Sequence, residues 1–201
     1  MAKWVYSFGD GAAEGRAEMK NLLGGKGAGL AEMTNLGIPV PPGFTISAAL
    51  CGNWLEAHSF PPRLRPQVEA ALGRLEAACG RAFGDSETPL LVSVRSGAAL
   101  SMPGMMETIL NLGLNDSTVE GLRRMSGNAG FAYDSYRRFV QMYGGVVFDV
   151  PKKLFEEALE RRRKQAGVQR DIDLPVDALH ELVGEYKQLI LQVSGKPFAF
   201  D

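Results

Sequence analysis

Four glycines within six residues constrain this chain more than any other local feature. The segment reads "NLLGGKGAGLAEM" and holds Gly24, Gly25, Gly27 and Gly29 around a single lysine, Lys26. Glycine has no Cβ, so its backbone adopts conformations and approaches that other residues cannot. A helix that starts here would offer backbone N–H groups and a partial positive charge to an anion. The segment therefore indicates either an anion-binding helix start or a flexible glycine-rich turn with a solvated lysine.

Two familiar phosphate-binding motifs do not fit this segment. A P-loop needs a glycine five residues before the Gly-Lys pair and Ser or Thr after it, but Lys20 and Gly27 occupy those places. The dinucleotide-binding fingerprint also fails, because its third glycine falls on Leu30 or Glu32. An anion site at this segment would therefore need a second cationic group from elsewhere in the chain.

Composition excludes several classes of protein. The 201 residues are 45% hydrophobic and 22% charged, which is typical of a folded globular chain, and the net charge is −1. A near-neutral chain has no broad basic surface, so we expect no nucleic-acid partner. No apolar run approaches the roughly 20 residues of a membrane helix, so we expect no membrane partner. Two cysteines, Cys51 and Cys79, and no signal peptide favour a cytoplasmic location.

Hydrophobic periodicity predicts short strands and several helices in the first part of the chain. Strands are expected at 3–8 and 43–47, and helices at 26–36, 48–57 and 66–81. Gly37 is expected to stop the helix 26–36. The run "PLLVSVRSGA" predicts a buried central strand, because apolar residues occupy consecutive positions.

Arg95 lies at the carboxyl end of that predicted strand, where open α/β sheets collect ligands. Its guanidinium matches phosphate geometry with two parallel hydrogen bonds. The alternative is an ion pair at the sheet margin. Three methionines then flank a Pro-Gly pair in "SMPGMMETIL", which indicates a shaped lid or platform over a site, or simply flexible filling of a core.

Several successive segments together resemble one family. "LLGGKGAGLAEM", "IPVPPGFTIS", "LLVSVRSGAALSMPGMMETILNLGLN", "YDSYRRFVQMYGGVV" and "SGKPF" occur in the order found in the N-terminal nucleotide-binding domain of the pyruvate, phosphate dikinases. The resemblance implies an α+β fold, namely part of an ATP-grasp-type nucleotide-binding domain with an inserted helical subdomain. It also implies that ATP phosphorylates a histidine on another domain, and that pyruvate then becomes phosphoenolpyruvate.

The resemblance assigns nucleotide-binding roles to four residues. Lys26 matches the loop lysine, Arg95 the phosphate-contacting arginine, and Gly104 and Thr108 supply a backbone amide and a hydroxyl to the phosphates. Thr108 is equally compatible with an ordinary strand residue. No catalytic residue and no metal ligand is assigned within the chain. The ligands of Mg²⁺, the phosphohistidine domain and the pyruvate-binding domain are expected outside these residues, and neither histidine lies in the family's histidine motif.

Helices are predicted for most of the remaining chain. Asp116 or Ser117 is expected to cap the first of them, with Glu120 completing a capping box after Ser117. Gly144 and Gly145 are expected to end the next one. The basic run 161–164 indicates a solvated helix end with pairs from Glu157 to Arg161 and from Glu160 to Lys164, or alternatively an anion-binding patch.

These observations together predict two regions and one main function. Residues 1–112 are expected to form the first part of the nucleotide-binding domain, and 113–201 a helical subdomain. The predicted function is the ATP-binding portion of a pyruvate, phosphate dikinase, inactive by itself. The alternatives are a non-catalytic truncated paralogue that acts as an interaction or regulatory module, and a fragment of a related water dikinase.

Overall fold

The computed structural model describes residues 2–51, 58–97 and 108–198, and the chain forms two compact units. The first unit comprises Met1–Gly80 and Ser96–Met106, and the second comprises Arg81–Arg95 and Glu107–Asp201. The mixture of helices with small sheets confirms the α+β class. Residues 81–95 thus belong to the same compact unit as the helices of the second half of the chain. The domain boundary that the sequence predicts after Leu112 concerns functional domains and stays a prediction.

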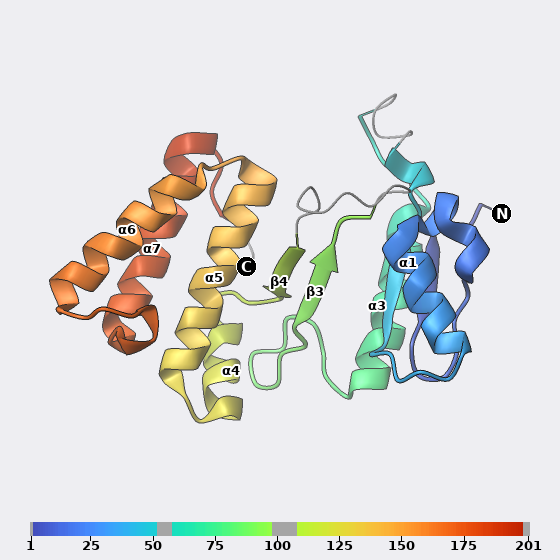
Figure 1. Ribbon diagram of the computed structural model, residues 1–201, viewed down its shortest axis with the longest axis horizontal. Helices are drawn as coiled ribbons and strands as arrows, with labels where there is room; N and C mark the ends of the chain where they lie inside the picture. The colour runs from blue at the N-terminus through green and yellow to red at the C-terminus, as the bar shows by residue number, and fades with distance from the viewer. Residues whose placement is uncertain (1, 52–57, 98–107, 199–201) are drawn as a thin grey trace. The chain divides into compact units, whose positions relative to one another are not determined.

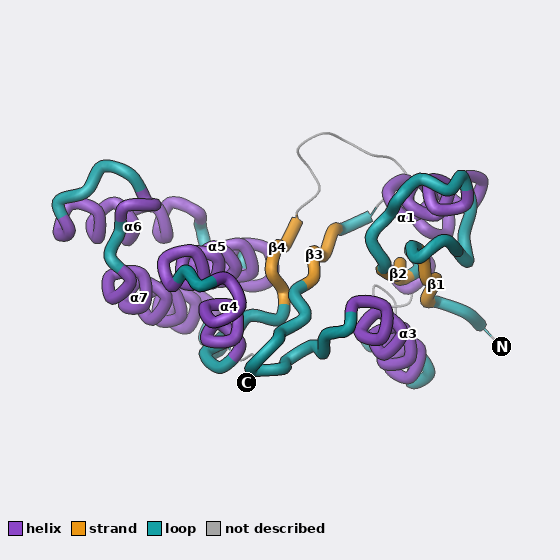
Figure 2. The backbone as a smooth tube through the Cα atoms, turned by 90° about the horizontal axis from the view of Figure 1, so that it is seen from below, coloured by secondary structure: helices purple, strands orange, loops and turns teal. Residues whose placement is uncertain are grey.

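The first unit places two short strands between two helices (Figure 2). Its elements are β1 (Val5–Phe8), the 3-10 turn η1 (Ala17–Met19), α1 (Lys20–Asn35), β2 (Gly43–Ile46) and α3 (Leu64–Cys79). The strands are antiparallel, with Val5 opposite Ile46 and Phe8 opposite Gly43. Val5, Leu50, Leu64 and Ala71 form the buried core of this unit. The strands at 3–8 and 43–47 and the helix at 66–81 are thereby confirmed to within a few residues.

Helix α1 begins six residues earlier than the sequence pattern indicated. It starts at Lys20 and is broken at Gly24, whose φ of 69° and ψ of 167° are not helical. The helix ends as predicted, because Gly37 has a φ of 76° and its N–H donates to the carbonyl of Thr34 while that of Ile38 donates to the carbonyl of Met33. These two bonds satisfy carbonyls that the helix leaves free at its end.

The second unit combines one antiparallel strand pair with a helical assembly (Figure 1). Its elements are β3 (Val92–Arg95), β4 (Thr108–Leu112), α4 (Thr118–Ser126), α5 (Ala129–Phe148), α6 (Lys152–Ala166), the 3-10 turn η2 (Asp171–Asp173) and α7 (Val176–Ser194). Helix α5 contacts β4, α4, α6 and α7, and so forms the centre of the unit. The core contains Tyr136, Phe139, Phe155, Tyr186 and Ile190, all at most 1% exposed.

Two sequence predictions about the second unit are wrong. β3 is not a buried central strand: in the described residues it pairs only with β4, and Val94 is 44% exposed. Gly144 and Gly145 do not end a helix, because α5 continues to Phe148. A Cβ on Gly144 would lie 2.8 Å from Cζ of Phe155 and 2.9 Å from Cδ1 of Ile190. This glycine therefore allows three helices to approach one another, which a sequence pattern does not distinguish from a helix stop.

Candidate functional site

The glycine-rich segment forms a break within α1. Gly24 is buried, and its dihedral angles lie in a region that only glycine occupies readily. The helix resumes at Gly25 and Lys26, both half-buried. The carbonyl of Leu22, in the turn before the break, accepts a hydrogen bond from the N–H of Ala48 at 2.8 Å. The break thus produces a second helix start next to Lys26, at which Gly24 itself is buried.

The two following glycines have different surroundings. A Cβ on Gly27 would lie 2.8 Å from both Cγ2 and Oγ1 of Thr45, so this glycine lets α1 lie directly on β2. A Cβ on Gly29 would meet no heavy atom of the described chain within 4 Å. Close packing therefore explains why position 27 is a glycine, but it does not explain the glycine at position 29.

Lys26 donates a hydrogen bond from Nζ to the backbone carbonyl of Ser96, at 3.1 Å. The two residues are 70 positions apart in sequence, and Ser96 directly follows Arg95. Gly97 also lies near this segment, since a Cβ there would be 3.9 Å from the carbonyl oxygen of Leu23. Ser96 and Gly97 therefore lie beside the break in α1, within the first unit.

Arg95 and Thr108 are brought together by strand pairing. Arg95 is the last residue of β3, Thr108 is the first of β4, and the two are directly opposite in the antiparallel register. Side chains at such positions lie on the same face, with Cβ atoms about 5 Å apart. Arg95 is exposed and Thr108 half-buried. No carboxylate in the described part of the second unit forms an ion pair with Arg95, so the ion pair considered as its alternative role is not seen there.

The remaining predicted site residue, Gly104, lies outside the described residues, as do the three methionines around it. The roles predicted for these positions stay predictions. Of the four residues, the structure thus pairs Arg95 with Thr108 and places Lys26 against Ser96.

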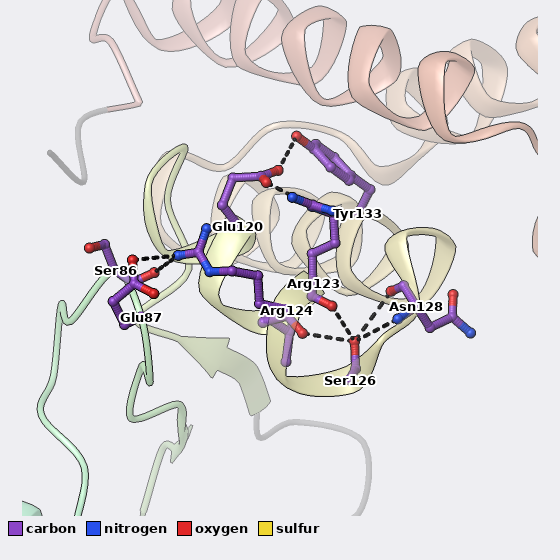
Figure 3. Close-up of polar contacts among 9 residues, drawn as sticks. Ser86, Glu87, Glu120, Arg123, Arg124, Ser126, Asn128 and Tyr133 are labelled. Atoms are coloured by element: carbon purple, nitrogen blue, oxygen red, sulfur yellow. Dashed lines mark hydrogen bonds and ion pairs between the residues drawn. The ribbon is translucent and has the colours of Figure 1, made fainter.

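The loop before β3 is held by α4, an arrangement that the sequence analysis did not predict (Figure 3). Arg124 donates from Nη2 to the carbonyl of Ser86 at 2.8 Å and to Oε1 of Glu87 at 2.9 Å. A Cβ on Gly121 would lie only 2.5 Å from the same Ser86 carbonyl oxygen. The single glycine inside this short helix was the available signal, because a glycine in a helix interior can mark a close backbone approach. This contact fixes the segment that leads into β3 and Arg95.

The predicted capping box of α4 is wrong. Ser117 occupies the N-cap position, but its side chain makes no capping hydrogen bond. Oδ1 of Asn115 instead accepts hydrogen bonds from the N–H groups of Ser117 and Thr118, at 2.9 and 2.7 Å. Glu120 instead accepts from Nε of Arg123 at 2.7 Å and from the hydroxyl of Tyr133 at 3.0 Å (Figure 3). The Arg123 contact lowers the pKa of Glu120 below its ordinary value. Asn115, three residues before Thr118, thus satisfies two N–H groups at the start of the helix without a capping box.

Asp116 ties the β4–α4 connection to the central helices. Its carboxylate accepts two hydrogen bonds from Nζ of Lys187, at 2.7 and 2.8 Å, and one from the hydroxyl of Tyr136 at 3.0 Å. Nζ of Lys187 also lies 5.3 Å from the ring centroid of Tyr136 and 5.8 Å from that of Phe198. Burial raises the pKa of Asp116, but the ammonium and the hydroxyl lower it by more, so the pKa lies below its ordinary value.

The basic run at the end of α6 is neutralised by acidic side chains, which supports the solvated helix over the anion-binding patch. Glu160 pairs with Lys164 at 2.7 Å as predicted. The predicted Glu157–Arg161 pair is wrong, because Arg161 pairs with Glu185 of α7. The other two arginines are also paired: Arg162 contacts Glu181 and Glu185, and Arg163 contacts Asp171. This run connects α6 with α7 and η2.

Among the described residues, neither histidine takes part in a cluster that could bind a metal ion. His180 lies on α7 and packs edge-on against the ring of Tyr133, with centroids 5.4 Å apart, and His58 lies in a loop. Across residues 2–51, 58–97 and 108–198, no three His, Cys, Asp or Glu side chains gather in a way that could hold a metal ion. Within the same ranges, no helix is long and apolar enough to cross a membrane.

The first unit has a helix start beside a lysine, and the second has an exposed arginine opposite a threonine; each feature is of a kind found in phosphate-binding α+β proteins. The comparisons with known proteins agree with this class. Residues 20–63 and 51–177 match the family described as "Pyruvate phosphate dikinase, AMP/ATP-binding domain". The chain belongs to this family.

Curated relatives match along the whole chain. The pyruvate, phosphate dikinase of Rhizobium meliloti (strain 1021) is 54% identical over 202 residues, which cover 100% of this chain and 22% of that protein. Pyruvate, phosphate dikinase 2 of Zea mays is 52% identical, over 98% of this chain and 22% of that protein. The pyruvate, phosphate dikinase of Clostridium symbiosum is 50% identical, over 98% of this chain and 22% of that protein. The chain therefore spans about a fifth of the length of these relatives.

Proposed function

We propose that this chain forms part of the ATP-binding site of a pyruvate, phosphate dikinase, within an ATP-grasp-type domain that carries an inserted helical subdomain. In that enzyme ATP, phosphate and pyruvate would become AMP, diphosphate and phosphoenolpyruvate through a phosphohistidine on another domain. The observation that carries the proposal is the cross-strand pair of Arg95 and Thr108. An exposed guanidinium beside a hydroxyl fits the oxygens of a polyphosphate, since both groups donate hydrogen bonds to it.

Lys26 supplies a second cation in our proposal. Within the first unit it donates a hydrogen bond to the carbonyl of Ser96, and the family resemblance assigns it to the nucleotide phosphates. In our proposal both side chains bind phosphate oxygens of ATP, with Gly104 and Thr108 contributing an amide and a hydroxyl. Mg²⁺ would shield the phosphate charge, and its ligands are expected in parts of the enzyme beyond these residues. A cytoplasmic location is also part of the proposal, although one Zea mays relative is named chloroplastic.

We expect this chain alone to form no phosphoenolpyruvate. The resemblance assigns the phosphoryl acceptor and the pyruvate site to other domains, and neither His58 nor His180 lies in the family's histidine motif. An assay of the purified chain with ATP, phosphate and pyruvate tests this. Turnover above a no-protein blank would contradict the assignment of those functions to other domains.

Substitution of Arg95 by lysine tests the site itself. Arg95→Lys keeps the charge but removes the planar pair of donors, so we expect ATP binding to weaken by roughly 1–3 kcal/mol. The matched control is Arg65→Lys on α3, whose guanidinium pairs with Glu69 and is 87% exposed. Titration calorimetry is done on the chain and on a chimera in which it replaces the matching 22% of the Rhizobium meliloti enzyme. Equal ATP affinity for Arg95→Lys and wild type, wherever wild type binds ATP, would refute the role of Arg95.

A further inference from the structure

The pairing between β3 and β4 changes register within the hairpin. Val92 is opposite Leu112, but Val94 is opposite Ile109 and Arg95 is opposite Thr108. Two steps along β3 therefore correspond to three steps along β4, so β4 contains one extra residue. An extra residue of this kind is a β-bulge, which bends a strand and redirects the side chains beyond it.

Asn111 carries the unusual backbone conformation of this bulge. Its φ is +60°, in the left-handed region where Asn is several times more frequent than most other non-glycine residues. The carbonyl of Asn111 accepts a hydrogen bond from the N–H of Leu114 at 3.2 Å, which turns the chain out of the strand toward α4. The bulge thus combines a left-handed residue with a turn at the end of β4.

Packing of β4 against the helices requires this irregularity. Ile109 is buried in the core of the second unit, and Leu112 also packs against that core. Residues three apart on a regular strand point to opposite faces, because side chains alternate with a period of two. The extra residue lets both side chains face the helices while Leu110, 42% exposed, does not.

The same irregularity decides what lies beside Arg95. If the pairing of Val92 with Leu112 continued without a bulge, three further steps would place Arg95 opposite Ile109, which is buried in the core. A slip of one residue turns every following side chain to the other face. With the bulge, Arg95 is opposite Thr108 and exposed.

We infer that Asn111 is a positioning residue for ATP binding: its left-handed backbone sets the register that places Arg95 beside Thr108. The link to ATP rests on the proposed function, whereas the link to register rests on the strand pairing alone. Asn111 acts through the backbone, so glycine should replace it and a β-branched residue should not.

The test compares Asn111→Gly with Asn111→Val in the 201-residue chain. NMR cross-strand contacts between the backbones of Arg95 and Thr108 report the register, and titration with ATP reports binding. Asn111→Gly should keep both the contacts and the affinity. Asn111→Val should lose the Arg95–Thr108 contacts and bind ATP roughly tenfold more weakly, because the guanidinium and the hydroxyl no longer share a face. The control, Leu110→Val, introduces the same β-branched side chain at the neighbouring residue, which is not among those with a positive φ. It should change neither the NMR contacts nor the ATP affinity.

Three outcomes decide the inference. If Asn111→Val keeps the Arg95–Thr108 contacts, or if Asn111→Gly loses them, Asn111 does not set the register. If Asn111→Val loses the contacts but keeps ATP affinity while Arg95→Ala lowers it, the register does not serve binding. If Arg95→Ala also leaves ATP affinity unchanged, the proposed function fails and the NMR contacts still judge the role of Asn111. Should Asn111→Val not fold, Asn111→Ala takes its place, because alanine also disfavours the left-handed region.

Discussion

Gly27 and Gly29 offer a direct test of why the first segment is rich in glycine. Both lie inside α1, two residues apart, so alanine should improve helix propensity at each by about 0.5–1 kcal/mol. The two positions differ in the space available for a side chain. The new Cβ at Gly27 would lie 2.8 Å from two side-chain atoms of Thr45 and 3.2 Å from Cβ of Leu23, whereas at Gly29 it would meet no described atom within 4 Å.

The clash at Gly27 is difficult to relieve. Threonine is stiff at χ1, and its methyl and hydroxyl groups both face the new Cβ, so α1 and β2 must move apart. Overpacking of this kind costs about 1–3 kcal/mol. We therefore expect Gly29→Ala to stabilise the chain by up to about 1 kcal/mol. Gly27→Ala should be about 1–3 kcal/mol less stable than Gly29→Ala, since the gain in helix propensity is common to both.

Urea unfolding followed by circular dichroism measures this difference. Both variants and the wild type are compared at one pH and one protein concentration, and the slope of the free energy against urea is checked for constancy. Equal free energies of unfolding for Gly27→Ala and Gly29→Ala would refute the close contact between α1 and β2. The pair needs no ligand, so its result does not depend on the proposed function.

Two further predictions concern the second unit. Gly144→Ala on α5 should be about 1–3 kcal/mol less stable than Gly184→Ala on α7. A Cβ at Gly144 would meet Phe155 and Ile190, whereas a Cβ at Gly184 would meet no described atom within 4 Å. Equal free energies of urea unfolding for the two variants would contradict the close packing of α5. Asp116 has a pKa held below its ordinary 3.8 in the folded chain, so its contribution to stability is complete above about pH 4 and is lost as the pH falls through the folded pKa. Asp116→Asn should therefore be less stable than wild type at pH 6 and approach it at pH 3, and a difference that stays constant between these two pH values would count against the Lys187 contact.

Periodicity predicted those elements whose pattern depends on one buried face. β1, β2 and α3 lie where alternation or helical spacing indicated, because each contributes apolar residues to the small core of the first unit. The apolar run of β3 was misread, since consecutive apolar residues predict burial on both faces and β3 has one strand neighbour in the described residues. A single strand's composition does not specify how many strands lie beside it.

Glycine was the other source of error, because one residue type serves several physical needs. Gly24 was placed before a helix and instead breaks one through a backbone conformation, and Gly144 was read as a stop but allows close packing. Neither use leaves a pattern in the surrounding sequence. The pairing of Arg95 with Thr108 was equally hidden, since it depends on a bulge at Asn111 that shifts the register by one residue.

Because some of these glycines have structural reasons, the glycine-rich segment as a whole is not evidence for ATP binding. Gly24 is required by its dihedral angles and Gly27 by its contact with Thr45, so both would be needed whether or not a nucleotide binds. Gly29 has no such architectural reason in the described residues, which makes it the informative position. If the absence of a side chain there serves a ligand, Gly29→Ala should weaken ATP binding while it stabilises the fold. ATP affinity equal to wild type in Gly29→Ala, measured by the same calorimetry as for Arg95→Lys, would leave Lys26 as the only part of the segment that our proposal assigns to ATP.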